Sequence, residues 1–378
     1  MGDRRPYRVI ISGGGTGGHI YPAIAIANAL KEMHSDTEIL FVGAEGRMEM
    51  QKVPEAGYPI IGLWISGLQR KLTVDNLAFP VKLISSSIKS FKILNEFKPQ
   101  AAVGVGGFAS GPLLYAASVK RIPSLLQEQN SYAGLTNKML ANQVQKICVA
   151  NPAMEKFFPE EKLVFTGNPV RREIVEMAQN GLDKKRTEAM EYFGLDPAKK
   201  TLLVIGGSLG ARTLNNSMIA NIDKLMDEQV QLIWQSGKIY YQQMKEQLEA
   251  MPNHEGIELR EFLNRMDLAY AASDVVISRA GALSISELAL VRKPVIFVPS
   301  PNVAEDHQRK NAEALVREQA ARMVTDDEAS TQLVDETLTL LKDEDQQQRL
   351  RQNIDRWARP NAAQHIAEEV VNLIESRG

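Results

Sequence analysis

Cysteine is almost missing from this chain of 378 residues, which contains only Cys148. A single cysteine excludes a disulfide framework within the chain and a metal site built from cysteines. It also favours a reducing, cytoplasmic setting, since oxidising compartments favour paired cysteines. Cys148 itself lies in an apolar run that is typical of a β-strand.

The sequence also lacks an excess of charge and a long apolar segment. Its 44 basic and 46 acidic residues leave a net charge of −2, which argues against a general nucleic-acid binder. No uninterrupted apolar run approaches the ~18 residues that span a bilayer, and residues 1–5 lack the apolar core of a signal peptide. The remaining composition, with 44% hydrophobic and 24% charged residues, predicts a soluble globular protein of two domains.

Glycine is concentrated in one stretch, Gly13-Gly-Gly-Thr-Gly-Gly18, which follows the β-branched run from Val9 to Ile11. Apolar residues then recur at helical spacing from Ile20 to Leu30, so the pattern predicts a strand, a glycine loop and a helix. Amides at the start of a helix carry partial positive charge, and glycine allows a phosphate to approach them closely. The stretch therefore predicts an anion-binding site, with His19 at the start of its helix.

The glycine loop by itself permits two interpretations. Its Gly13-x-Gly15-x-x-Gly18 spacing matches the dinucleotide fingerprint, and Glu45, beyond a predicted strand from Ile39 to Val42, is placed to bind a ribose of NAD. That interpretation, an NAD-dependent oxidoreductase, leaves His19 without a role. His19 is then either bonded to the backbone or a group that takes part in the chemistry.

The strand and glycine-loop pattern recurs twice further along the chain. Ala101 to Pro112 repeats it in the first half, and Thr201 to Arg212 begins the second half in the same way. Two similar halves predict two doubly wound, Rossmann-like α/β domains that face each other. Between them, residues 167–171, Gly-Asn-Pro-Val-Arg, are typical of a hinge.

The second half also contains a candidate serine nucleophile. Gly206-x-Ser208-x-Gly210 matches the nucleophile elbow of α/β-hydrolases, and Asp274 and His307 follow in the order of a catalytic triad. A hydrolase sheet would extend across the elbow, whereas here a complete α/β unit precedes it. A serine hydrolase therefore stays as an alternative, beside the oxidoreductase and a binding module without turnover.

Two polar groups are predicted at the carboxyl ends of strands, where ligands bind in parallel sheets. Gln127-Glu-Gln-Asn130 follows a predicted strand from Ile122 to Leu126. Ser284 and Glu287 follow another predicted strand, from Asp274 to Ser278. Their spacing matches a capping box, so Glu287 is either part of a helix cap or an acceptor for a ribose diol.

A basic amphipathic helix is predicted between Val74 and Phe97. Apolar residues recur there every three or four positions, and most of the charged residues are lysines. The helix either packs its apolar stripe on the core or lies on the surface and docks on anionic lipid. The stripe comprises Leu77, Val81, Ile84, Ile88 and Phe91, and lysines of the helix include Lys82, Lys89 and Lys92.

Several of these motifs, in their order and spacing, resemble the MurG family of N-acetylglucosaminyltransferases over nearly the whole chain. The resemblance implies the two-domain glycosyltransferase-B fold. It implies an N-terminal domain on the acceptor and membrane side, residues 1–166, a C-terminal donor domain, residues 167–357, and a helix, residues 358–378, that returns to the first domain. The matching residues are 13–19 with Pro22, 104–107, 110–112, 128–130, 134–138, 167–171, 206–212 and 282–287.

The same resemblance implies an activity. This is the inverting transfer of GlcNAc from UDP-GlcNAc to the 4-hydroxyl of the muramic acid in lipid I, which gives lipid II for peptidoglycan synthesis. Transfer to another lipid acceptor is the alternative. The implied enzyme is a peripheral protein on the anionic membrane surface at the cytoplasmic face of the bacterial cell membrane. It requires no cofactor, since no Asp-x-Asp motif stands at a predicted strand end, although ancillary Mg²⁺ stays compatible with the sequence.

The resemblance also assigns residues to roles. His19 or Glu128 would be the general base for the attacking hydroxyl. Relatives often have His where this chain has Gln127 and Tyr where it has Phe108, and Gln127 cannot act as a base. The implied donor contacts are Thr16, Gly17, Gly18, Asn130, Arg171, Ser208, Leu263, Ala282, Leu283, Ser284, Ile285, Ser286, Glu287 and Gln308, and the implied acceptor contacts are Gly106, Gly107 and Asn137.

For four of these residues the resemblance also implies which part of UDP-GlcNAc they contact. The backbone of Leu263 would meet uracil, Glu287 the ribose and Gln308 the hydroxyls of GlcNAc. Arg171 and the starts of helices would balance the charge of the diphosphate.

Overall fold

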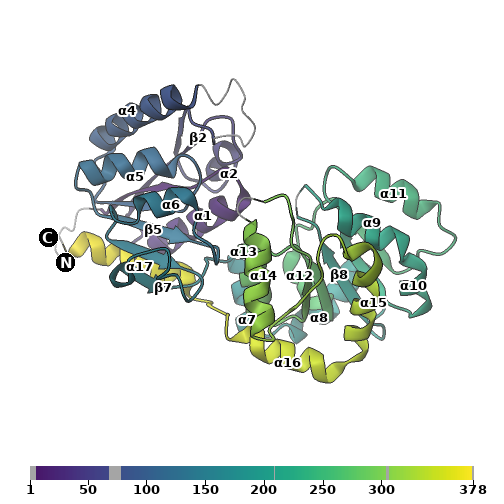
Figure 1. The fold of residues 1–378 in the computed structure, drawn as a ribbon. Coiled ribbons are helices and arrows are strands. Elements are labelled where there is room, and N and C mark those ends of the chain that lie inside the picture. The colour runs from purple at the N-terminus through teal and green to yellow at the C-terminus, as the bar shows by residue number, and fades with distance from the viewer. Residues whose placement is uncertain (1–5, 68–77, 208, 304–305, 377–378) are drawn as a thin grey trace. The chain divides into compact units, whose positions relative to one another are not determined.

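The structure, a computed structural model, describes residues 6–67, 78–207, 209–303 and 306–376. The chain divides into two compact units, one of Met1–Arg171 with Arg359–Gly378 and the other of Arg172–Ala358. The first unit contains a sheet of seven strands and the second a sheet of six, with helices packed on both (Figure 1). All strand pairs in the two sheets run parallel, so the predicted doubly wound α/β architecture is confirmed.

The sheet of the first unit has the strand order β3-β2-β1-β4-β5-β6-β7. Its strands are β1 (Arg8–Ser12), β2 (Glu38–Ala44), β3 (Ile60–Leu63), β4 (Ala101–Gly104), β5 (Ser124–Glu128), β6 (Lys146–Val149) and β7 (Leu163–Phe165). Its helices are α1 (Gly17–Met33), α2 (Glu49–Glu55), α4 (Phe79–Phe97), α5 (Ser110–Val119), α6 (Leu135–Leu140), the short 3₁₀ helix η1 (Glu160–Lys162) and α17 (Ala362–Glu375).

The sheet of the second unit has the order β10-β9-β8-β11-β12-β13. Its strands are β8 (Thr201–Ile205), β9 (Gln231–Gln235), β10 (Ile257–Arg260), β11 (Val275–Ser278), β12 (Val295–Phe297) and β13 (Arg322–Met323). Its helices are α7 (Arg172–Asn180), α8 (Asp183–Phe193), α9 (Arg212–Ala220), α10 (Ile222–Asp227), α11 (Tyr241–Glu249), α12 (Met266–Ala272), α13 (Ala282–Val291), α14 (His307–Arg317), α15 (Ala329–Lys342) and α16 (Glu344–Asp355).

Each sheet changes the direction of its winding at one central strand. In the first unit β1 pairs with β2 on one side and with β4 on the other. In the second unit β8 pairs with β9 on one side and with β11 on the other. Ligands of doubly wound folds bind outside the carboxyl ends of the strands at such a switch point. The loops after β1 and β4, and those after β8 and β11, are therefore the places to search for a site.

The central strands of the first unit, such as β1, β4 and β5, are buried on both faces, which explains their largely apolar sequences. Val9 and Ile11 of β1 belong to a buried cluster with α1 and α17, whereas Ile10 belongs to the cluster on the other face with α4, α5 and α6. The core of the second unit contains Trp234 of β9, which is fully buried and donates its Nε1–H to Asn215 Oδ1 at 3.0 Å.

The last helix, α17, packs against α1, the helix that follows the first glycine loop (Figure 1). Ile366 and Val370 of α17 are fully buried in the same cluster as Ile20 of α1. The return of the C-terminal helix to the first unit, expected from the sequence, is thus confirmed.

The predicted basic helix is described from Phe79 to Phe97, and a strand that the sequence did not reveal precedes it in the chain. The strand is β3, and α4 is described from Phe79, while the predicted start from Val74 to Leu77 lies outside the described residues. Val81, Ile84 and Ile88 are 58%, 62% and 65% exposed. The buried side of α4 is formed instead by Ser86, Ser90, Ile93 and Leu94, with Phe91 partly buried against the core. The interpretation that the whole apolar stripe packs on the core is therefore wrong.

Replacement of Ile366 by alanine tests how far α17 stabilises the first unit. Because Ile366 is fully buried against α1 and the sheet, we expect Ile366→Ala to lower the free energy of unfolding by ~2–5 kcal/mol. Urea unfolding of the full chain, followed by circular dichroism, measures the change. Glu368→Ala, on an exposed position of the same helix, should change stability by less than ~0.5 kcal/mol. Equal effects of the two variants would contradict the packing described here.

Candidate active site

The two glycine loops of the first unit lie against each other at the switch point. A Cβ atom added at Gly107, where φ is +89°, would lie 2.5 Å from the carbonyl oxygen of Gly14. Only glycine permits both that backbone conformation and that contact. The loop after β4, which contains the predicted acceptor residues Gly106 and Gly107, is thus in contact with the loop after β1.

The loop after β1 is bound by a carboxylate of α2 that the sequence did not single out. Glu49, the first residue of α2, is fully buried and accepts hydrogen bonds from the amides of Gly15 and Ala44, both at 2.9 Å. A Cβ at Gly14 would lie only 2.1 Å from Glu49 Oε1. A buried carboxylate needs such N–H partners, so Glu49 ties the glycine loop to the end of β2.

Glu49 also decides against the dinucleotide interpretation of this loop. The amide of Gly15 already donates its hydrogen bond to Glu49, whereas in a dinucleotide-binding fold it would bind the pyrophosphate. Glu45, the expected ribose acceptor, forms an ion pair with Lys89 at 3.0 Å. The amides of Gly17 and Gly18 open α1, and amides of a first helical turn have no acceptor within the helix. An anion at this loop would therefore bind at Gly17 and Gly18, beside the exposed Thr16.

His19 lies in the first turn of α1, and its half-buried ring lies against Gly106. A Cβ at Gly106, where φ is +96°, would lie 2.8 Å from His19 Cε1 and Nδ1, so the loop after β4 leaves room for the imidazole. His19 Nδ1 lies 3.2 Å from Oε1 of Gln129, a residue that follows β5. The structure therefore brings together the first loop, the second loop and the segment after β5 around one imidazole.

Glu128, the other candidate base, is enclosed by hydrogen-bond donors. Its side chain is 2% exposed, and Oε1 accepts from the backbone N–H and the Nδ2 of Asn130 at 3.0 and 3.3 Å. Its Oε2 accepts from the amide of Gly134 at 2.9 Å and from Asn137 Nδ2 at 2.8 Å. Both oxygens thus order the turn that leads from β5 to α6. Glu128 thus binds both Asn130, a predicted donor contact, and Asn137, a predicted acceptor contact.

The structure places in different environments the two residues that depart from the family pattern, Gln127 and Phe108. Gln127 is fully buried in β5 and donates from Nε2 to Asn168 Oδ1 at 2.9 Å, so it has a place in the interior of the unit. Phe108 is 45% exposed, and its ring lies beside Gly67, where a Cβ would approach it to 2.2 Å. Arg171, predicted to contact the diphosphate, is the half-buried last residue of the N-terminal segment of this unit.

In the second unit the predicted donor residues gather on the first turns of α13, which follows β11. Ala282, Leu283, Ser284 and Ser286 are half-buried and Ile285 is buried in these turns. Ser208 lies outside the described residues, although its neighbours Gly207 and Leu209 belong to the loop after β8. The predicted residues of α13 therefore lie beside the switch point of the second sheet.

Ser284 and Glu287 do not form the expected capping box. The residue before the first turn of α13 is Gly281, and Ser284 lies inside the helix without capping it. Glu287 is buried, and its Oε2 accepts a hydrogen bond from the hydroxyl of Tyr270 on α12 at 3.0 Å. The capping interpretation is wrong because the helix begins two residues before Ser284.

Further hydrogen bonds arrange the carboxyl edge of the second sheet. The amide of Leu263 donates to Gln235 Oε1 at 3.1 Å, and the amide of Ser300 donates to Gln308 Oε1 at 2.9 Å. Arg279, which the sequence did not single out, donates from Nη1 to the carbonyl of Val298 at 2.9 Å and to Asp326 Oδ1 at 2.5 Å. Arg279 thereby joins the ends of β11 and β12 next to α13. The signal that could have identified Arg279 from the sequence is its position directly after a strand rich in β-branched residues.

The catalytic triad of the hydrolase alternative is not assembled. Asp274 precedes β11 and accepts a hydrogen bond from the amide of Thr201, the first residue of β8, at 2.7 Å. Asp274 therefore lies at the amino ends of these strands, whereas the loop of Gly207 and Leu209 follows the carboxyl end of β8. The hydrolase interpretation is wrong for this reason.

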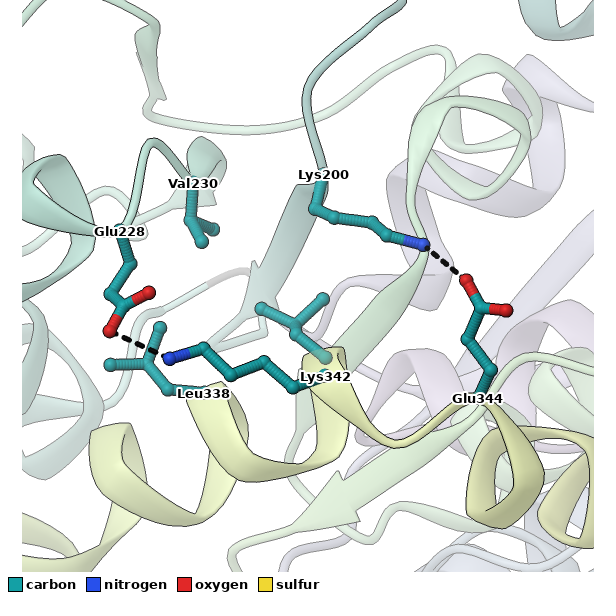
Figure 2. A pocket seen from close by; sticks show the side chains of 7 residues that line it. Lys200, Glu228, Val230, Leu338, Lys342 and Glu344 are labelled. Atoms are coloured by element: carbon teal, nitrogen blue, oxygen red, sulfur yellow. Dashed lines mark hydrogen bonds and ion pairs between the residues drawn. The ribbon is translucent and has the colours of Figure 1, made fainter.

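A hollow of about 290 Å³ lies at the same amino edge of the second sheet (Figure 2). Lys200 pairs with Glu344 at 3.4 Å, and Lys342 pairs with Glu228 at 2.7 Å, so the charges around it neutralise one another. Its apolar lining comes from Val230, Leu338 and Leu341. The position of this hollow, away from the carboxyl ends of the strands, excludes it as the ligand site of a doubly wound sheet.

Cys148 is fully buried in β6, and burial raises the pKa of its thiol to about 12, so it is a thiol at neutral pH. Within the ranges that the structure describes, no group of three or more His, Cys, Asp or Glu side chains could bind a metal ion. Among the helices of these same ranges, none combines the length and the apolar character that crossing a bilayer requires.

Comparison with known proteins agrees with this arrangement. Residues 9–149 match the glycosyltransferase family 28 N-terminal domain, and residues 201–370 match the family 28 C-terminal domain. The crystal structure of MurG from Acinetobacter baumannii superposes with a TM-score of 0.78 at 28% identity, covering 97% of this chain and 100% of that one.

Two curated relatives have the same printed name, UDP-N-acetylglucosamine--N-acetylmuramyl-(pentapeptide) pyrophosphoryl-undecaprenol N-acetylglucosamine transferase. The protein of Cytophaga hutchinsonii is 56% identical over 377 residues, which are 100% of this chain and 99% of the relative. The protein of Flavobacterium psychrophilum is 52% identical over 371 residues, 98% of this chain and 99% of the relative. With such identity over its full length, and with two parallel sheets of the glycosyltransferase-B type, this chain belongs to the MurG family of N-acetylglucosamine transferases.

Proposed function

We propose that this chain transfers GlcNAc from UDP-GlcNAc to the 4-hydroxyl of the muramic acid in lipid I, with inversion at the anomeric carbon, and so forms lipid II. The observation that carries the proposal is the 56% identity over the whole chain to a relative named for this transfer. The predicted site residues that the structure describes follow the carboxyl ends of strands in their sheets, where doubly wound folds bind their ligands. Transfer to a different lipid acceptor is the alternative.

The donor is bound by the second unit. The first amides of α13 face the edge at which β11 ends, and such amides stabilise the negative charge of a diphosphate. Glu287 supplies carboxylate oxygens for the ribose diol, and Gln308 amide hydrogens for the sugar. The amide of Leu263 donates to Gln235, so the carbonyl of Leu263 is the backbone group that binds uracil. Arg171 and helix amides, with or without ancillary Mg²⁺, balance the charge of the departing UDP.

The general base is His19, and Glu128 orders the turn around it. Inversion requires that the acceptor hydroxyl lose a proton while its oxygen attacks the anomeric carbon and the bond to UDP breaks. His19 has a partly exposed ring, and imidazole is the side chain most often used to take up a proton near neutral pH. Glu128 is nearly fully buried and accepts four hydrogen bonds, which leaves it poorly placed to reach a substrate hydroxyl.

Replacement of His19 tests this assignment. We expect His19→Ala to lower kcat by ~100- to 10,000-fold with little change in the donor KM, because a base acts mainly in the transition state. The measurement is the release of UDP from UDP-GlcNAc with and without a lipid I analogue. Glu128→Gln should destabilise the turn after β5 but keep a larger share of kcat. If a folded Glu128→Gln variant were inactive while His19→Ala stayed active, the two roles would be reversed.

A second prediction concerns the ribose. Glu287→Gln keeps an oxygen for the hydroxyl of Tyr270 but removes the negative charge from the diol, so we expect UDP to bind roughly 10- to 100-fold more weakly. Isothermal titration with UDP measures the affinity. Tyr270→Phe, which keeps the carboxylate, serves as the control and should weaken binding much less. UDP affinity equal to that of the wild type in Glu287→Gln would assign Glu287 a purely structural role.

The enzyme acts as a peripheral protein at the cytoplasmic face of the cell membrane, and α4 docks there on anionic lipid. Val81, Ile84 and Ile88 form an exposed apolar stripe on this helix. Two of the flanking lysines have exposed partners, since Lys89 pairs with Glu45 at 3.0 Å and Lys92 approaches Glu96 at 3.8 Å. Lys82 donates to the hydroxyl of the half-buried Ser66 at 3.0 Å. Such surface pairs are weak, so the lysines can exchange them for lipid phosphates. An apolar stripe beside lysines is the arrangement that lies in a membrane interface.

Reversal of charge on this helix tests the docking. Each lysine near anionic lipid contributes about 1 kcal/mol, so Lys82, Lys89 and Lys92 changed together to Glu should weaken binding to anionic vesicles by at least ~100-fold. The effect should be largest at low salt, where screening is weakest. Vesicle sedimentation measures binding, and turnover of a short-chain, water-soluble acceptor should hardly change.

A matched variant separates docking from total charge. Lys199, Lys224 and Lys245 are exposed lysines of the second unit, and their joint change to Glu alters the net charge equally. This variant should bind vesicles nearly as the wild type does. Equal vesicle binding by both triple variants would contradict the docking and leave α4 as an ordinary surface helix.

A further inference from the structure

A row of three buried side-chain amides leads to the imidazole of His19. Asn168 accepts at Oδ1 from Gln127 Nε2 at 2.9 Å, and Gln127 Oε1 accepts a short hydrogen bond from Gln129 Nε2. Gln129 Oε1 then faces His19 Nδ1 at 3.2 Å. The three amides are 3%, 0% and 2% exposed for Asn168, Gln127 and Gln129, so their interactions are made within the protein.

Two backbone carbonyls determine which way each amide points. Gln129 Nε2 donates to the carbonyl of Val105 at 2.7 Å, and Asn168 Nδ2 donates to the carbonyl of Gln129 at 3.2 Å. A carbonyl oxygen only accepts, so both amide nitrogens must face these groups. Asn168 Oδ1 consequently accepts from the amide nitrogen of Gln127, and Gln127 Oε1 accepts from that of Gln129. The oxygen of Gln129 is the atom that faces His19.

The orientation of Gln129 decides the tautomer of His19. An amide oxygen cannot donate, so the hydrogen of this contact belongs to His19 Nδ1. A neutral imidazole with its proton on Nδ1 carries its lone pair on Nε2. An isolated histidine side chain favours the other tautomer, with the proton on Nε2. The buried amides therefore act against the intrinsic preference of the ring.

We infer that Gln129 is a positioning residue that holds His19 in the Nδ1–H tautomer and so makes Nε2 the basic atom, with Gln127 and Asn168 fixing the orientation of Gln129. This inference rests on the proposed role of His19 as the general base. In the transfer, Nε2 takes the proton of the acceptor hydroxyl, the oxygen forms its bond to the anomeric carbon, and the bonding pair to the β-phosphate oxygen leaves with UDP. A neutral amide orients the ring without the carboxylate charge that would favour imidazolium.

The first experiment uses the wild-type full chain labelled with ¹⁵N-histidine. Two-dimensional NMR above the titration range of histidine shows which ring nitrogen lacks a proton, through its couplings to Hδ2 and Hε1. The chain has five histidines, and the signals lost in His19→Gln identify those of His19. We expect the unprotonated nitrogen to be Nε2. A proton on Nε2 would overturn the inference, and this result needs no variant of Gln129 to fold.

The second experiment replaces Gln129 by methionine, which has a similar length but neither an amide oxygen nor an amide nitrogen. We expect Gln129→Met to shift His19 toward the Nε2–H tautomer and to lower kcat roughly 10- to 100-fold, as loss of an outer partner of a functional histidine does, with the donor KM unchanged within about twofold. A folded variant with wild-type tautomer and kcat would overturn the inference.

The matched control is Gln231→Met in the second unit. Gln231 is also buried, accepts from the amide of Asp196 at 2.6 Å and donates to the carbonyl of Asp196 at 2.9 Å. Its replacement should cost stability but leave the His19 tautomer and kcat as they are. A similar fall of kcat in both variants would reduce the role of Gln129 to stability and overturn the inference.

The failures of the two proposals are distinguishable. A large loss of kcat in His19→Ala together with a proton on Nε2 in the wild type would keep the base and reject the positioning by Gln129. Wild-type kcat in His19→Ala would reject the base itself, and the positioning role with it.

Discussion

Parallel pairing on both sides of a central strand is the constraint on which the site depends. Because β1 pairs with β2 and β4, and β8 with β9 and β11, the loops that follow these strands emerge at one edge of each sheet. Helices then begin at that edge, so their first amides are directed toward it. The glycine loops, His19 and the start of α13 owe their positions to this geometry. The hollow at the opposite edge, between Lys200 and Lys342, shows that concavity alone does not mark the site.

Buried carboxylates in the first unit organise loops. Glu49 binds the amides of Gly15 and Ala44, and Glu128 binds the turn that follows β5. A buried anion is costly unless donors surround it, so each of these residues collects N–H groups and thereby rigidifies a loop. Preorganised loops of this kind cost little reorganisation during reaction. His19, in contrast, is approached by the uncharged Gln129.

Helix α4 buries one face and exposes an apolar row on another. Its small and apolar residues Ser86, Ser90, Ile93 and Leu94 pack inward, while Val81, Ile84 and Ile88 face solvent. Exposed apolar residues in a continuous row are uncommon unless another surface covers them. The proposed docking on anionic lipid would cover this row.

The sequence by itself determined the features that depend on local pattern. β-branched runs marked strands such as β1 and β8, glycine runs marked the loops that follow them, and helical spacing marked α17. Its ordered motifs also indicated the family. Tertiary structure alone decided which side of α4 is buried, where α13 begins relative to Ser284, and what Glu49 and Gln129 touch. Glu49 meets Gly15 across 34 positions and Gln129 meets His19 across 110. Contacts between residues so far apart depend on how strands align in a sheet, and a hydrogen bond of that kind imposes no periodicity on the sequence near either partner.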